Sequence, residues 1–121
     1  MVLSIISGIY AIVIGIGILG LWLMLYRTNQ IPELETAPVE IKYHVTAEVV
    51  MGLLSLISGV LLLVNLTWAS SFFILAMGFI IYSIINSAGY YAERKQWSFV
   101  LMFGIILIVS VLLVILTFFS L

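Results

Sequence analysis

Four long stretches of this sequence are almost continuously apolar, and together they take up most of the chain. Each has about the 20 residues that an α-helix needs to cross the hydrocarbon core of a bilayer. The stretches cover residues 2–26, 44–64, 68–91 and 97–121. Only 7% of the residues are charged, against about 25% in a typical soluble domain. Such a chain could not cover a water-facing surface, so the sequence predicts an integral membrane protein whose principal partner is the lipid bilayer.

The continuity of the apolar runs separates helices from strands. A membrane β-barrel alternates apolar and polar residues over segments of roughly ten residues, whereas runs such as 61–64 and 105–109 do not alternate. Helices and closed barrels are the two ways to satisfy backbone hydrogen bonds in lipid. We therefore expect an all-α fold, an integral membrane antiparallel four-helix transmembrane bundle that forms one domain over residues 1–121.

The charged residues are distributed unevenly among the predicted loops. The basic residues are Arg27, Lys42, Arg94 and Lys95. They lie at the long loop 27–43 and at the link before the fourth span, whereas residues 65–67 carry no charge. Lys and Arg in short loops mark the cytoplasmic side. Because the number of spans is even, a multi-pass protein with both termini on the non-cytoplasmic side is expected.

Composition excludes several kinds of chemistry. The chain has no cysteine, so disulfides, thiol catalysis and thiolate metal sites are excluded. Its net charge of −1 gives no basic face for nucleic acid. Nothing in the sequence indicates a cofactor or an enzyme.

Small residues recur at the spacing used where membrane helices pack closely. Ser7, Ala11 and Gly15 lie four apart in the first span, as do Ser55 and Gly59 in the second. Small residues at this spacing let two helix backbones approach each other in lipid. We expect them to pack inside the bundle, and a homodimer interface is the alternative.

The most specific polar feature lies near the start of the second span. His44 is the single histidine, and Glu48 lies about one turn inside the span. Four residues apart, the two share a helix face. Asn86 and Tyr90 lie in the half of the third span that should meet them, with Tyr82 deeper. The sequence predicts that these five residues form a polar cluster.

Three interpretations of this cluster remain open. It could be a structural hydrogen-bond network that fixes helix register. It could bind or pass a proton, a cation or a small polar solute, because ionisable groups inside membranes often mark such pathways. It could also be a metal site or an enzyme. His44 and Glu48 could bind one metal with Glu93 as an added ligand, although a dedicated site usually has more ligands, and the sequence leaves the metal unknown.

The leading hypothesis is a small non-enzymatic membrane protein with a cytoplasm-facing polar pocket. In it Glu48 responds to a proton or cation, His44 tunes Glu48, and Asn86 and the tyrosines orient the ligand. Glu48 would be charged if paired with His44, Lys42 or Arg94, and neutral if apolar surroundings favour its protonated form. The alternative is an accessory or structural subunit of a larger membrane complex. A homo-oligomer is compatible with the first hypothesis.

Overall fold

The computed structural model describes residues 2–121, and its regular secondary structure within that range is helical. The elements are α1 (Val2–Arg27), α2 (Glu33–Thr36), α3 (Pro38–Leu63), α4 (Ala69–Glu93) and α5 (Trp97–Phe119). Four of them, all but α2, are long and apolar enough to cross a membrane. The prediction of an all-helical chain with four such helices is confirmed.

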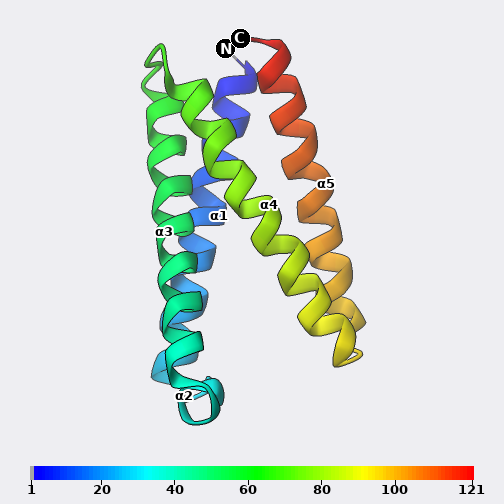
Figure 1. The fold of residues 1–121 in the computed structure, drawn as a ribbon. Helices are drawn as coiled ribbons and strands as arrows, with labels where there is room; N and C mark the ends of the chain where they lie inside the picture. The colour runs from blue at the N-terminus through cyan, green and yellow to red at the C-terminus, as the bar shows by residue number, and fades with distance from the viewer. Residues whose placement is uncertain (1) are drawn as a thin grey trace.

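The four long helices are arranged as two closely packed pairs. α1 packs along α3, α4 packs along α5, and α3 connects the pairs by packing against α4. Figure 1 shows both chain termini and the α3–α4 link at one end, with α2 and the α4–α5 link at the other. In the same view α3 and α4 diverge toward the end that carries α2.

Glycines allow α1 and α3 to pack with their backbones almost in contact. A Cβ added to Gly15 would lie 2.7 Å from the carbonyl oxygen of Gly52, and one added to Gly59 would lie 2.5 Å from that of Gly8. The hydroxyl of Ser55 also donates a hydrogen bond of 2.7 Å to the carbonyl oxygen of Ala11. The prediction that these small residues pack inside the protein is confirmed for this pair of helices.

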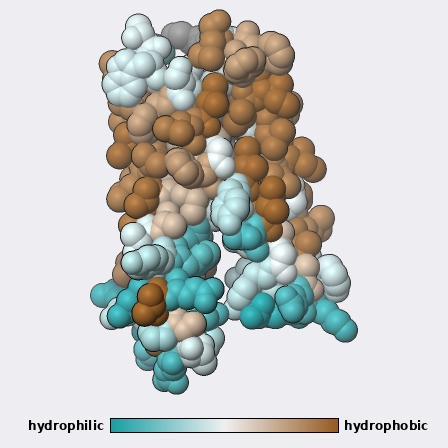
Figure 2. Space-filling model, viewed as in Figure 1, coloured by the Kyte–Doolittle hydropathy of each residue, from teal (hydrophilic) through white to brown (hydrophobic). Residues whose placement is uncertain are grey.

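The core between the pairs comes mainly from one stripe of α4. Phe73, Met77 and Ile80 are fully buried, at the three- and four-residue spacing that places them on one helix face. Ala11 of α1 and Leu113 of α5 belong to the same cluster. Many other large apolar side chains are exposed on the outer surface, which is brown along most of its length in Figure 2. That surface is typical of a protein whose solvent is lipid.

In each of the three links between long helices, the second residue after the helix is in the left-handed conformation. Asn29, Asn65 and Lys95 have φ angles of 56°, 61° and 55°. The residue after each one donates its backbone N–H to the carbonyl five positions earlier, as Gln96 does to Tyr91 at 3.0 Å. This is the Schellman arrangement, which ends a helix and satisfies its last carbonyl groups.

The segment expected to be a loop, residues 27–43, contains more helix than the sequence indicated. It includes α2, and α3 begins at Pro38, six residues before the expected start at 44. Proline breaks the interior of a helix, but in the first helical turn its missing N–H leaves no hydrogen bond unmade and its φ angle already suits the helix. The remaining helix ends differ from the expected ones by two residues or fewer.

Candidate functional site

The carboxyl group of Glu48 lies in the interior, where α1, α3 and α4 meet. Glu48 is 6% exposed. Its Oε2 accepts a 2.6 Å hydrogen bond from the Ser83 hydroxyl of α4. Its Oε1 accepts a 3.3 Å hydrogen bond from the indole N–H of Trp22 on α1. Both donors are neutral, so neither compensates a negative charge on the carboxyl.

Trp22 also connects Glu48 to His44. The indole and imidazole rings meet edge to face, with centroids 5.6 Å apart. His44 is exposed, one helical turn before Glu48 on α3. The imidazole therefore lies at the outer edge of the Glu48 site and contacts it through the indole ring.

A cavity of about 260 Å³ opens beside this carboxyl, and we call it the Glu48 cavity. Its polar lining comes from Glu48, Ser83, Ser87 and Trp22, and the rest is apolar. The apolar lining residues are Val13, Ile14, Gly17, Ile18, Leu21, Ile80, Ile84, Phe103 and Ile106. Figure 2 shows the hydrophilic end of the protein divided into two lobes, one around α2 and one around the α4–α5 link. α1 and α3 lead to the first lobe, and α4 and α5 to the second (Figure 1).

The structure brings together only some of the residues that the sequence suggested. Of the five, Glu48 is buried and His44 reaches it through Trp22, whereas Tyr82, Asn86 and Tyr90 are exposed along one stripe of α4. Tyr90 instead lies under the guanidinium of Arg94, whose central carbon is 3.5 Å from the ring centroid. A binding role for these three residues stays a prediction, and they do not line the Glu48 cavity.

Sequence reasoning missed three residues of the site: Trp22, Ser83 and Ser87. Tryptophan near the end of a span usually anchors the helix at the membrane interface, so the position of Trp22 in the sequence does not indicate a site residue. Ser83 and Ser87 lie one position beyond Tyr82 and Asn86, and that single step turns a helical residue by about 100°. A polar stripe at 83 and 87 was visible in the sequence, beside the more polar stripe of Tyr82 and Asn86.

A second hydrogen-bonded group connects α1 to α5. The hydroxyl of Tyr10 donates to the carbonyl oxygen of Ile106 at 3.1 Å and lies 2.6 Å from the hydroxyl of Ser110. Tyrosine has one O–H, so Ser110 is the donor in the shorter contact. Ser110 is fully buried. These bonds join the two pairs of helices on the side opposite the α3–α4 contact.

Comparison with known proteins identifies the family. A family described as a domain of unknown function, DUF8058, matches residues 1–120. The chain belongs to the DUF8058 family. No curated protein and no solved structure matches the chain.

The chemistry of this DUF8058 site depends on the carboxyl and its apolar surroundings. Each oxygen of a carboxylate can accept more than one hydrogen bond, so Glu48 keeps acceptor capacity beyond Ser83 and Trp22. Across residues 2–121, no group of three or more His, Cys, Asp or Glu side chains is placed to hold a metal ion. The arrangement can hold a ligand by contact with one carboxyl group, one indole ring and apolar side chains.

Proposed function

We propose that this DUF8058 protein is a non-enzymatic, multi-pass membrane protein that binds a small, largely apolar solute carrying a positive charge. The binding group would be the carboxyl group of Glu48. The observation that carries the proposal is a buried carboxyl with two neutral donors beside a mostly apolar cavity. An ionised carboxylate in such surroundings is costly unless a cation pairs with it.

The cavity's other properties support the same class of ligand. Its volume of about 260 Å³ is just below the range typical of drug-sized ligands, so the solute would be small. The Trp22 indole lies next to the carboxyl, and aromatic faces attract cations, most strongly when both are removed from water. The apolar lining would pack against the uncharged part of the solute.

The proposed orientation places the Glu48 cavity toward the cytoplasm. The antiparallel transmembrane bundle would have the α2 and α4–α5 ends inside and both termini outside. All four basic residues lie at the end of the protein that carries α2 and the α4–α5 link. They support this orientation, since Lys and Arg in short loops are retained in the cytoplasm. In this placement the two hydrophilic lobes of Figure 2 flank the cytoplasmic approach to the cavity.

The direct test is binding of benzyltrimethylammonium, a small aromatic cation whose charge does not change with pH. Isothermal titration calorimetry of the purified protein in lipid nanodiscs measures the dissociation constant. Glu48→Gln keeps the shape of the side chain but removes its charge and exchanges one acceptor oxygen for an NH₂ donor, from which the Ser83 hydroxyl can accept. We expect affinity to fall at least about tenfold, or about 1.4 kcal/mol.

The matched control is Glu40→Gln, the same change at an exposed position of the same helix. Its affinity should equal that of the unchanged protein. If the unchanged protein binds no cation, and Glu48→Gln alters only thermal stability, Glu48 is a structural residue. That result would contradict the proposal and favour an accessory or structural subunit.

A further inference from the structure

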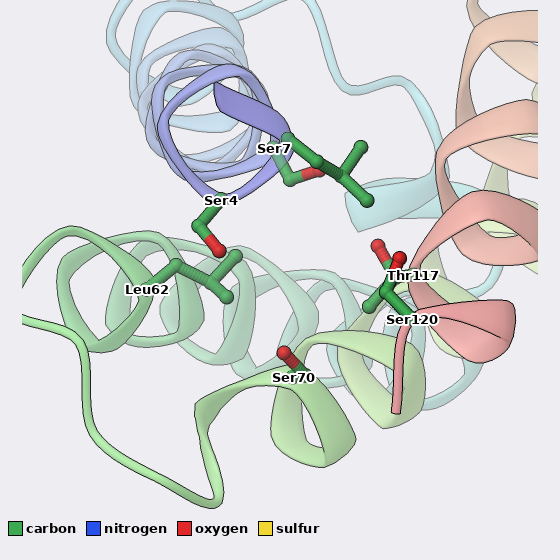
Figure 3. Close-up of a pocket in the computed structure, with 7 residues that line it drawn as sticks. Ser4, Ser7, Leu62, Ser70, Thr117 and Ser120 are labelled. Atoms are coloured by element: carbon green, nitrogen blue, oxygen red, sulfur yellow. The ribbon is translucent and has the colours of Figure 1, made fainter. Parts of the chain in front are cut away.

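A second polar pocket lies at the end of the protein where the two termini meet, far from the Glu48 cavity. We call it the hydroxyl pocket, and its volume is about 180 Å³. Its lining residues are Leu3, Ser4, Ser7, Leu62, Ser70, Thr117 and Ser120. Five of these seven carry hydroxyl groups and none carries a charge. Figure 3 shows the hydroxyl-bearing side chains converging from α1, α4 and the end of α5.

Two of these hydroxyls are buried with no hydrogen-bond partner in the described part of the chain. They are Ser7 Oγ and Thr117 Oγ1, on residues that are 1% and 3% exposed. Figure 3 shows both hydroxyl oxygens facing the space between α1 and α5. Other buried serines do find partners: Ser58, for example, donates to the carbonyl oxygen of Ser55 at 2.8 Å. Both unpaired hydroxyl groups belong to residues that line the hydroxyl pocket.

Physical chemistry favours water as the occupant of this pocket. A buried polar group without a partner costs about 1–3 kcal/mol, and water removes that cost where a cavity is polar, roomy and offers two to four hydrogen-bond partners. The hydroxyl pocket meets these conditions, because hydroxyls both donate and accept. The absence of charge among its lining residues disfavours an ion as its resident ligand.

The hydroxyl pocket and the Glu48 cavity lie along the same helices. On α4, for example, Ser70 lines the first and Ile80, Ser83 and Ser87 line the second. On α5, Thr117 lines the first and Ile106 the second. Both cavities also include residues of α1 and α3.

Buried side chains lie between the two cavities along α4. Phe73 and Met77 of α4 are fully buried between Ser70 and Ile80. At a corresponding level of α1, beyond Ser7, the Tyr10 hydroxyl bonds to Ser110 and to the Ile106 carbonyl. Together these residues form a layer that combines apolar packing with a hydrogen bond between α1 and α5.

We propose that the hydroxyl pocket is a water-filled vestibule on the non-cytoplasmic side, and that it and the Glu48 cavity are the two ends of one route through the protein. The route rests on the proposed function, because the hydroxyl pocket would be a second entrance through which the solute reaches Glu48. The water-filled vestibule stands without it. The layer of Phe73, Met77 and Tyr10 is the closed barrier between the two ends.

Cysteine accessibility tests the vestibule in a chain with no cysteine of its own. Ser7→Cys and Thr117→Cys are made singly, and the protein is reconstituted in lipid vesicles. Their reaction with a charged, membrane-impermeant methanethiosulfonate reagent is timed by mass spectrometry. The control is Ser58→Cys, which is fully buried on α3 and outside the pocket. A thiol in dry apolar surroundings stays protonated and inert, so we expect the pocket thiols to react at least about tenfold faster.

The result that overturns the vestibule is reaction as slow as that of Ser58→Cys at both pocket positions. Ser4→Cys and Ser70→Cys, at half-buried positions of the same pocket, keep the test decisive if a variant fails to fold. Neither measurement involves a ligand of Glu48. Failure of the vestibule is therefore distinguishable from failure of cation binding by the calorimetric test.

The barrier is tested with Ser87→Cys, which reports on the Glu48 cavity. When the reagent is added only on the side of the membrane that carries the two chain termini, we expect Ser87→Cys to be labelled no faster than Ser58→Cys. Adding Met77→Ala, which removes side-chain volume from the barrier, should raise the rate at least about tenfold. If the double variant folds and stays unreactive from that side, the two cavities are not ends of one route. If Ser87→Cys alone already reacts from that side, the barrier is not closed.

Discussion

At the scale of single residues, Tyr10 makes the hydrogen bonds that connect α1 to α5. We expect Tyr10→Phe to lower the free energy of unfolding by about 0.5–1.5 kcal/mol, the usual net contribution of a hydrogen bond. The loss should not be larger, because Ser110 can donate instead to the carbonyl of Ile106, four residues earlier on its own helix. Reversible unfolding in mixed micelles measures the difference.

The control for this prediction is Tyr43→Phe, where the same hydroxyl is removed from a side chain that is 78% exposed. It should leave the free energy of unfolding unchanged. Equal effects at the two positions would show that the bond between α1 and α5 contributes nothing to stability.

The sequence predicted the carboxyl of the site but not its partners. Glu48 stood out because an acid within an apolar span is rare, and the structure places it in the interior. Its contact with Ser83 depends on the rotation of α4 about its own axis. The sequence offers two neighbouring polar stripes on α4, one through Tyr82 and Asn86 and one through Ser83 and Ser87. Spacing alone could not decide which stripe faces inward.

At the scale of helices, the contact between α1 and α3 depends on glycines that leave no room for a side chain. Gly59→Ala would place a Cβ 2.5 Å from the carbonyl oxygen of Gly8 and 3.0 Å from the backbone nitrogen of Ile12. Since both atoms belong to the backbone, the helices would have to separate. We expect a loss of about 1–3 kcal/mol in unfolding free energy, as for other overpacked cores.

Gly20→Ala is the matched control on α1, because a Cβ there meets nothing within 4 Å. Alanine is the better helix former by about 1 kcal/mol, so this variant should be unchanged or slightly more stable. Thermal unfolding of both variants in the same detergent gives the comparison. A destabilised Gly20→Ala, or a neutral Gly59→Ala, would contradict the packing.

Helix existence was predictable from the apolar runs, but the start of α3 was not. Long apolar runs leave few alternatives in lipid, and all four long helices appeared where expected. Residues 38–43 include Glu40 and Lys42 among apolar residues, so they do not extend the apolar pattern. Only the position of Pro38 in the first helical turn shows why the helix begins there.

At the scale of the whole molecule, the two ends differ in charge, and the proposed orientation can be measured directly. Gln30→Cys and Thr67→Cys place single thiols at exposed positions of opposite ends. In intact cells, a membrane-impermeant thiol reagent should label Thr67→Cys at once and Gln30→Cys only after permeabilisation. The basic residues predict this result through their retention in the cytoplasm. The reverse pattern would place both termini in the cytoplasm.

The hydroxyl pocket shows why a site shared among helices is the hardest feature to predict from sequence. Its serines and threonine lie on three different helices, and isolated hydroxyls are common in membrane spans, where they can bond to their own helix backbone. Ser120 does so, donating to the carbonyl oxygen of Leu116 at 2.8 Å. Only the assembled structure shows that Ser7 and Thr117 have no such partner.

The short link between α3 and α4 bears on how the chain enters the bilayer during synthesis. In the proposed orientation residues 64–68 must be carried across the hydrocarbon core, and they include no charged side chain. A lysine or an aspartate at the centre of a span opposes insertion by about 2.5–3.5 kcal/mol. An uncharged hairpin avoids that cost, so α3 and α4 can be threaded across together. A lysine in this link would oppose translocation of the hairpin, and it would also place a positive charge on the non-cytoplasmic side. The five residues of the link therefore influence both whether the hairpin crosses the bilayer and which orientation the protein adopts.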